Sequence, residues 1–318
     1  MKLCHENRIR QQPSSCQGNL DGYFVNVRIT IKRGVKMEFY TVNINGNTIQ
    51  LADYPGKKGT IIAIHGLTGT HKNMHYYAEK FKGDYRFIAV DLRGRGNSAE
   101  TDADTSIFKH AEDILGLIKE LKIDSPILLG YSMGAFIAAI VASKLKSTKA
   151  VILLDGAAKA SDHQKDIVQP SLGRLSREFT SEEHYVSEIQ KIYTNLGIEW
   201  NDVLQNTVEY EVALVGDHWE NKSTEVRIVA DFESFFTFDP EQICSQIDCP
   251  ILLVYAEGNI GAMPPLFYLT DYEQTRQSTK TIETVISDCN HYTMVFENRE
   301  DINGYIEDFL NKYVEGNE

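Results

Sequence analysis

The sequence predicts an α/β fold, a mostly parallel twisted sheet with helices on both faces and a helical insertion. Two observations carry this prediction. Short apolar runs, typical of strands buried on both faces, alternate with segments of helical periodicity. One apolar run, at residues 127–129, leads directly into Gly130-Tyr131-Ser132-Met133-Gly134 and then into a small, apolar stretch. A strand, a sharp turn with serine at its tip and a helix are therefore expected in succession.

The first 36 residues show no clear period, although residues 23–31 are compatible with a strand. From Met37 the pattern is regular, because residues 38–44 alternate like a strand, Asn45-Gly46 is a hairpin turn and residues 48–52 form the return strand. Residues 32–37 would also suit codons resembling a ribosome-binding site before a start codon. We interpret residues 1–36 as an extension that is not native, with Met37 as the biological start. The alternative is a real but dispensable N-terminal arm.

The expected core consists of residues 37–156 and 241–318. Its further strands are predicted at 60–64, 86–90, 126–129, 150–154, 251–255 and 281–286. Helices are predicted between them at 71–82, 106–122, 133–146, 264–278 and 299–313.

The alternation breaks at residues 157–240, which are polar, helix-prone and aromatic toward their end. This stretch lies between two predicted strands, so we expect an insertion above the carboxyl edge of the sheet. Open α/β sheets bind ligands at that edge. The insertion is therefore predicted to be a cap or lid that shapes a pocket and excludes water.

Composition limits the function classes. The formal net charge of −13 argues against nucleic acid and anionic membrane surfaces as partners. No window approaches the apolar length of a membrane span, and the first 20 residues lack the apolar centre of a secretory signal. The five cysteines form no C-x-x-C pair, which favours free thiols in a reducing cytoplasm, with a Cys244–Cys249 disulfide left open. Nothing in the sequence indicates an oligomeric state.

Ser132 is the predicted nucleophile. The turn must strain its backbone so that the hydroxyl stands clear of the sheet, and glycines two residues before and after it allow strand and helix to approach closely. The helix that follows directs its first N–H groups toward charge that develops beside the serine.

Two loops should meet Ser132 at the same edge. His65-Gly66-Leu67-Thr68-Gly69 follows a strand, and we expect the backbone N–H groups of Leu67 and Met133 to form an oxyanion hole; a tight turn with no such role is the alternative. His291 follows the last strand and is expected to serve as the base, because imidazole titrates near neutral pH.

The acid that orients His291 is ambiguous. Asn259 stands where the third member often lies, and asparagine supplies no carboxylate. Asp155, at the end of strand 150–154, is the favoured acid, and Glu257 is the alternative. A dyad without an acid is also open.

For the other conspicuous polar residues, a structural role is favoured over a functional one. His71 and His75 have the i, i+4 spacing of metal ligands but no evident third ligand, so a structural role is favoured and no metal is expected. Asp91 and Arg93 are interpreted as a turn in which Arg93 pairs a nearby carboxylate. His163 and the pair His218-Trp219 lie in the predicted cap; a role without substrate contact is favoured, and contact with substrate is the alternative.

These motifs together resemble the α/β-hydrolase superfamily, and most of all its small capped esterases and lipases. The resemblance runs from about residue 37 to 314 and rests on four motifs: His65-Gly66, the turn at residues 91–98, the elbow at residues 130–134, and Asn290-His291 with Glu297-Asn298. It implies a serine hydrolase that needs no metal or organic cofactor. The chain departs from the common pattern at Asn259, in place of aspartate, and at Asn290, in place of glycine. Some members place their acid after the earlier strand, which fits Asp155.

The expected activity is hydrolysis of a small or medium, uncharged or apolar carboxylic ester through an acyl-enzyme. Lactone, amide, thioester or carbon–carbon cleavage would use the same residues. The alternative is a ligand receptor or signalling protein of the same fold that turns its ligand over slowly or not at all.

Overall fold

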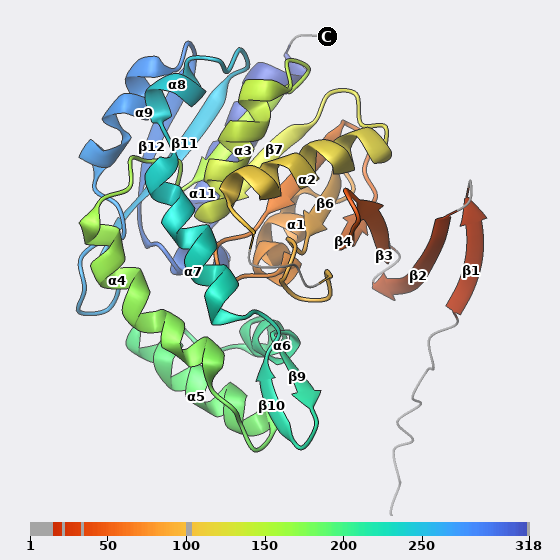
Figure 1. The fold of residues 1–318 in the computed structure, drawn as a ribbon. Helices are drawn as coiled ribbons and strands as arrows, with labels where there is room; N and C mark the ends of the chain where they lie inside the picture. The colour runs from red at the N-terminus through yellow and green to blue at the C-terminus, as the bar shows by residue number, and fades with distance from the viewer. Residues whose placement is uncertain (1–14, 21–22, 33–34, 100–103, 317–318) are drawn as a thin grey trace, which may run out of the picture.

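The computed structural model describes residues 15–20, 23–32, 35–99 and 104–316. One sheet runs through these residues in the order β1-β2-β3-β4-β6-β5-β7-β8-β11-β12 (Figure 1). The strands from β6 to β12 in this order are parallel, and those from β1 to β4 join them through antiparallel pairs. The strand bounds are β1 Ser15–Leu20, β2 Tyr23–Lys32, β3 Val35–Ile44, β4 Asn47–Tyr54, β5 Thr60–Ile64, β6 Arg86–Val90, β7 Ile127–Tyr131, β8 Ala150–Leu154, β11 Ile251–Gly258 and β12 Ile282–Asn290.

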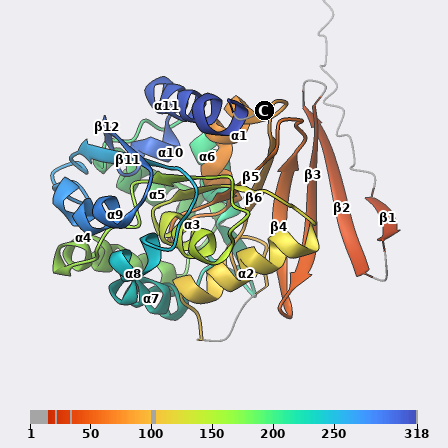
Figure 2. The same cartoon turned by 90° about the horizontal axis from the view of Figure 1, so that it is seen from above.

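Helices cover both faces of the sheet (Figure 2). One face carries α2 (Ile107–Glu120), α3 (Met133–Lys144), α8 (Pro240–Cys244) and α9 (Glu273–Ser278). The other carries α1 (His75–Phe81), α10 (Thr293–Phe296) and α11 (Glu300–Leu310). The predicted α/β fold class is confirmed.

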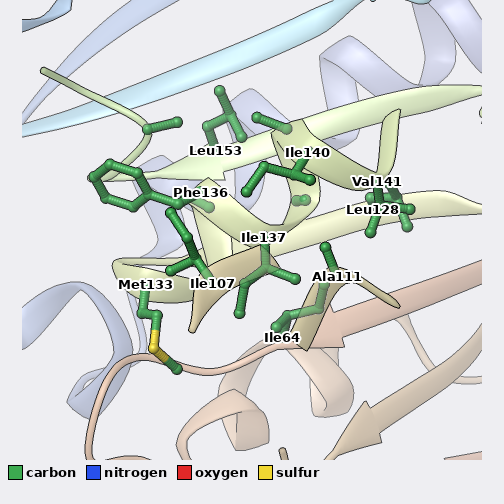
Figure 3. Packing of buried hydrophobic residues seen from close by; sticks show 14 of the residues in the cluster. Ile64, Ile107, Ala111, Leu128, Met133, Phe136, Ile137, Ile140, Val141 and Leu153 are labelled. Carbon is green, nitrogen blue, oxygen red and sulfur yellow. The ribbon is translucent and has the colours of Figure 1, made fainter. Parts of the chain in front are cut away.

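Alternation along each strand divides the core into two halves. In β5, Ile62 and Ile64 pack toward α2 and α3, whereas Ile61 and Ala63 pack toward α1. Figure 3 shows the first half, where apolar side chains of α2 and α3 interlock over Ile64 and the neighbouring strands. Helix α3 is buried almost all round, which explains why its sequence lacks a polar face. This packing fixes the position of the α3 N-terminus, where Ser132 lies.

Residues between β8 and β11 form α4 (Asp162–Leu172), α5 (Glu182–Asn195), α6 (Asp202–Tyr210) and α7 (Glu225–Ser234). The 3₁₀ turns Gly173–Ser176 and Phe235–Thr237 and the hairpin of β9 (Val212–Val215) with β10 (His218–Asn221) complete this stretch. We call residues 157–240 the inserted segment; its helices lie together at one end of the molecule (Figure 1). This hairpin was not predicted from the sequence; Val212 and Val215 favour a strand, and Gly216, with a φ of 64°, allows the turn.

The N-terminal hairpin has the expected turn, since Asn45 and Gly46 both adopt positive φ, 51° and 85°. The first strand of this hairpin, β3, begins at Val35 and pairs with β2, so regular structure starts before Met37. Of the expected extension 1–36, residues 1–14, 21–22 and 33–34 lie outside the described residues. Met37 as the biological start stays a prediction.

The predicted helix at 264–278 is too long. The structure has a 3₁₀ turn at Leu269–Tyr272 followed by α9. Pro264 and Pro265 lack the N–H groups of a helix interior, and a residue before proline favours extended backbone. Met263 accordingly forms a bridge with Ile260 instead.

Two further observations bear on the sequence-based expectations. Cys244, Cys249 and Cys289 are free thiols, which removes the Cys244–Cys249 disulfide that the sequence left open. Along the described stretches of the chain, no helix combines the length and apolar character that crossing a bilayer demands.

Candidate active site

Ser132 stands at the tip of a tight turn between β7 and α3. Its φ of 54° and ψ of −118° are unusual for a residue other than glycine. A Cβ on Gly130 would lie 2.1 Å from the carbonyl oxygen of Gly134, and one on Gly134 would lie 2.0 Å from that of Ile64. Only glycine therefore allows strand, turn and helix to pack this closely, as the sequence pattern predicts.

His291 connects Ser132 to Asp155. Its Nε2 lies 3.0 Å from Ser132 Oγ, and its Nδ1 lies 2.7 Å from Asp155 Oδ2. All three side chains are buried. With Nδ1–H donating to the carboxylate, Nε2 is left with its lone pair toward the serine hydroxyl.

Asp155 is held by further donors. It follows β8 with a positive φ of 45°, and its Oδ1 accepts the Tyr272 hydroxyl at 3.0 Å and the Ala256 N–H at 3.3 Å. Glu257 is exposed at the end of β11. Of the two carboxylates proposed from the sequence, the structure brings Asp155 to His291.

Hydrogen bonds to its backbone and to Asn290 hold the loop that carries His291. The Tyr131 hydroxyl donates to the His291 carbonyl at 2.9 Å. Asn290 Oδ1 accepts the N–H groups of Tyr292 and Thr293, each at 2.9 Å, and its Nδ2 donates to the carbonyl of Leu196 in the inserted segment at 3.1 Å. Asparagine in place of the more common glycine thus ties this loop to the inserted segment.

The loop after β5 lies against the serine, since a Cβ on Gly66 would lie 3.2 Å from Ser132 Cβ. His65 supports this loop from beneath. Its Nε2 accepts the Leu92 N–H at 3.0 Å, so Nδ1 carries the proton and donates to the Gly66 carbonyl at 2.7 Å. Burial lowers the pKa of His65 to about 3, which keeps the ring neutral in this role.

A second support for the same loop comes from Arg95, whose Nε donates to the Leu67 carbonyl at 3.1 Å. Arg95 is fully buried and pairs with Asp231 of α7, which also accepts from Thr105 and contacts His110 Nε2 at 3.0 Å. The backbone of Leu67 and the start of α3 at Met133 therefore have fixed positions beside Ser132. Their role as oxyanion donors stays a prediction.

A pocket of about 400 Å³ opens over Ser132 and His291. Its walls are mainly apolar and come largely from the inserted segment and from residues 263–267 and 292–296, with Ile167, Val168, Ile192, Phe232, Phe235 and Phe267 among them. The size and apolar lining are typical of a site for a small organic molecule.

Sequence reasoning missed two charged residues that line this pocket, Arg174 and Glu211. Burial raises the pKa of Glu211 to about 7, although the charge of Arg174 and a 2.7 Å hydrogen bond from the Tyr185 hydroxyl oppose the shift. The available signal was weak: each is a charged residue beside apolar neighbours, in a segment whose helix boundaries the sequence did not define.

The histidines and the tryptophan for which the sequence favoured a structural role do not line the pocket. His163 Nε2 contacts the Pro265 carbonyl at 2.9 Å, and His218 contacts Asp217 at 3.3 Å on the surface. Neither of these histidines, nor Trp219, is among the residues that line the pocket.

The other predicted polar residues form buried contacts near the loops. His71 Nδ1 lies 2.8 Å from Asp91 Oδ1, and the Arg93 guanidinium makes a bidentate pair with Asp113 at 2.5–2.6 Å, as expected. His71 and His75 belong to no group of three or more potential metal ligands within the described ranges. Burial alone would raise the pKa of Asp91, but attraction and hydrogen bonds from His71 outweigh it and hold this pKa below its usual range.

Known proteins show the same arrangement of chain. The crystal structure of E-2-(acetamidomethylene)succinate hydrolase superposes with a TM-score of 0.76 and 19% identity over 86% of this chain and 99% of that one. N-formylmaleamate deformylase of Pseudomonas putida is 26% identical over 70% of this chain and 80% of its own. A Haemophilus influenzae protein named "Putative esterase/lipase" is 30% identical, but the match spans only 36% of this chain and 37% of that protein.

A model of one family matches most of the chain. The alpha/beta hydrolase fold family aligns with residues 59–298, from β5 to the loop after α10. That range includes Ser132, Asp155 and His291 together with the whole inserted segment. This chain therefore belongs to the alpha/beta hydrolase fold family.

Proposed function

We propose that the protein is a serine hydrolase that cleaves a small or medium carboxylic ester through an acyl-enzyme. One observation carries the proposal: the buried hydrogen-bonded line from Ser132 Oγ through His291 to Asp155 Oδ2, at the base of the pocket. A nucleophile and a base within hydrogen-bond reach, with the base oriented by a third group, are what such catalysis requires.

In the first half of the reaction, Ser132 Oγ attacks the ester carbonyl while His291 Nε2 takes its proton. Asp155 holds the ring in the reactive tautomer and stabilises the imidazolium. The N–H groups of Leu67 and Met133 bind the oxyanion of the tetrahedral intermediate. His291 then gives its proton to the departing alcohol, and the acyl group remains on Ser132.

In the second half, water attacks the acyl-enzyme with His291 again as base, and the acid product leaves. The inserted segment, residues 157–240, acts as a cap over the core formed by residues 37–156 and 241–318. Its apolar side chains exclude bulk water, which strengthens the oxyanion contacts. The free cysteines of the described chain favour a reducing compartment, and we propose the cytoplasm.

The substrate follows from the pocket and the chemistry. A volume of about 400 Å³ suits acyl chains of short to medium length. One relative is named a deformylase and another an esterase/lipase. An amide panel therefore belongs beside the ester panel, because the same residues serve both acyl transfers.

A series of 4-nitrophenyl esters from acetate to dodecanoate tests the proposal. We expect a maximum of kcat/KM at short or medium length and a burst of one nitrophenol per enzyme before the steady state. Folded Ser132→Ala should retain less than about one thousandth of the activity. The proposal is wrong if folded wild-type protein turns over no ester or amide in the series, which would favour a receptor.

A further inference from the structure

Among the described residues, three of the side chains that line the pocket belong to residue types that can carry a charge near neutral pH: His291, Arg174 and Glu211. His291 is assigned above. Arg174 lies in the 3₁₀ turn Gly173–Ser176, where the inserted segment passes from α4 toward α5. Its Nη2 lies 3.4 Å from Oγ1 of Thr68, the residue after Leu67. The cation therefore faces the pocket beside the loop that borders Ser132.

Building on the proposed function, we propose that Arg174 binds a carboxylate carried by the substrate, so that the preferred substrate is an anionic ester of a small dicarboxylic or carboxylated compound. This replaces the uncharged or apolar ester expected from sequence. Guanidinium recognises a carboxylate through two parallel N–H donors, which fixes the orientation of the substrate as well as its affinity.

The surroundings of Arg174 strengthen this contact. Most of the pocket wall is apolar, and water is displaced from it when substrate enters, so the attraction between guanidinium and carboxylate is less screened than at the surface. Burial lowers the pKa of Arg174, but the electrostatic attraction of its surroundings outweighs burial, and the net shift of this pKa is upward. Arg174 thus remains a cation at any pH at which the enzyme works.

Glu211 competes with the substrate for this cation. Tyr185 and Tyr193 of α5, Arg174 and Lys222 are the titratable groups around it; the Tyr185 hydroxyl donates to Glu211 Oε2 at 2.7 Å. Because burial raises the pKa of Glu211 to about 7, much of the competing negative charge is removed at neutral pH and most of it at pH 6. An anionic substrate should therefore bind more tightly as the pH falls from 8 to 6.

Matched substrates test the proposal directly. The mono-4-nitrophenyl ester of adipic acid is compared with the neutral 4-nitrophenyl ester of adipic acid monoamide. A second pair, 4-carboxyphenyl butyrate and 4-carbamoylphenyl butyrate, places the carboxylate on the leaving group. The measured quantity is the ratio of kcat/KM for the anionic ester to that for its neutral partner.

We expect wild type to prefer the anionic member of one pair by about 10- to 100-fold, and Arg174→Met to remove this preference through KM. Arg174→Lys should restore only part of it, because an ammonium lacks the planar pair of donors. Arg177→Met is the matched control: Arg177 lies three residues away, half exposed and outside the pocket, so the ratio should stay at the wild-type value. Glu211→Gln should raise the preference at pH 8 and flatten its dependence between pH 6 and 8.

Two results would overturn the proposal. One is a wild-type ratio near one in both pairs; the other is an equal loss for anionic and neutral esters in Arg174→Met, which indicates a purely structural role. If no ester is turned over, the proposed function fails, but the binding claim is still measured. Calorimetry with adipate should then show binding to Ser132→Ala and at least tenfold weaker binding to Ser132→Ala/Arg174→Met; equal binding rejects the anionic subsite.

Discussion

Replacing Asp155 with asparagine exchanges one carboxylate oxygen for an NH2 group and leaves the backbone unchanged. Asp155 has a positive φ of 45°, a region that asparagine tolerates better than most residues. The side-chain shape is also preserved. The variant therefore isolates the carboxylate, whereas Asp155→Ala would add backbone strain and a cavity.

The neighbours of Asp155 decide how the new amide orients. If its oxygen faced His291, its NH2 group would face the Ala256 N–H across 3.3 Å, an arrangement of two donors that costs about 1–3 kcal/mol. The amide therefore turns its NH2 group toward His291 Nδ1. The histidine proton then moves to Nε2, which can no longer accept the proton of Ser132.

Loss of the charge adds to this penalty. A carboxylate about 4 Å from the developing imidazolium contributes about 4 kcal/mol at an effective dielectric constant of 20. Together with the tautomer term this gives about 5–7 kcal/mol, and each 1.36 kcal/mol is a factor of ten in rate. We expect kcat to fall about 10⁴-fold, the size of effect known for neutralised triad acids.

The assay is steady-state hydrolysis of the best 4-nitrophenyl ester, with folding checked by circular dichroism and thermal melting. Glu257→Gln serves as the matched control, because Glu257 is an exposed carboxylate at the end of β11, and it should remain within about twofold of wild type. A folded Asp155→Asn protein with more than a tenth of wild-type kcat would refute the assignment.

Three stability predictions follow, each measured by urea unfolding. Gly130→Ala puts a Cβ 2.1 Å from a main-chain oxygen of α3 and should lower the free energy of unfolding by at least about 2 kcal/mol. Gly304→Ala lies in open space within α11 and should raise it by about 0.5–1 kcal/mol. A Gly304→Ala protein less stable than Gly130→Ala would contradict the packing. Asp231→Ala leaves buried Arg95 without its anion and should cost about 3–5 kcal/mol; a loss below 1 kcal/mol rejects this view. Since the pKa of Glu211 is raised from 4.5 to about 7, the folded protein holds a proton that the unfolded chain has released, and stability falls as pH rises through this window. Glu211→Gln should therefore gain stability relative to wild type between pH 5 and 8, and an unchanged difference would contradict the shift.

The central strands were predicted well because a strand buried on both faces is a continuous run of apolar residues. The strands at 60–64, 86–90 and 150–154 have their predicted bounds. The elbow was predictable for another reason: backbone contacts near 2 Å require glycine at two fixed positions around Ser132. Both signals come from constraints that act within a few residues.

Features that depend on contacts between distant parts of the chain were predicted less well. Asp155 and Glu257 end neighbouring strands, and only the direction of each side chain decides which one reaches His291. The predicted helix at 264–278 failed because helical spacing was weighed above two successive prolines. Arg174 was missed because its position depends on how the inserted segment folds back over the sheet, which no local pattern encodes.

Covalent labelling of Ser132 tests the central claim most directly. Folded wild-type protein is incubated with a fluorophosphonate probe, and peptide mass spectrometry locates the adduct; Ser132→Ala is the control. Activation of Ser132 by His291 and Asp155 predicts one adduct on Ser132, none in Ser132→Ala, and labelling slowed about 10⁴-fold in Asp155→Asn. Absence of labelling in folded wild type, or labelling that persists in Ser132→Ala, would contradict the assignment of Ser132 as the nucleophile.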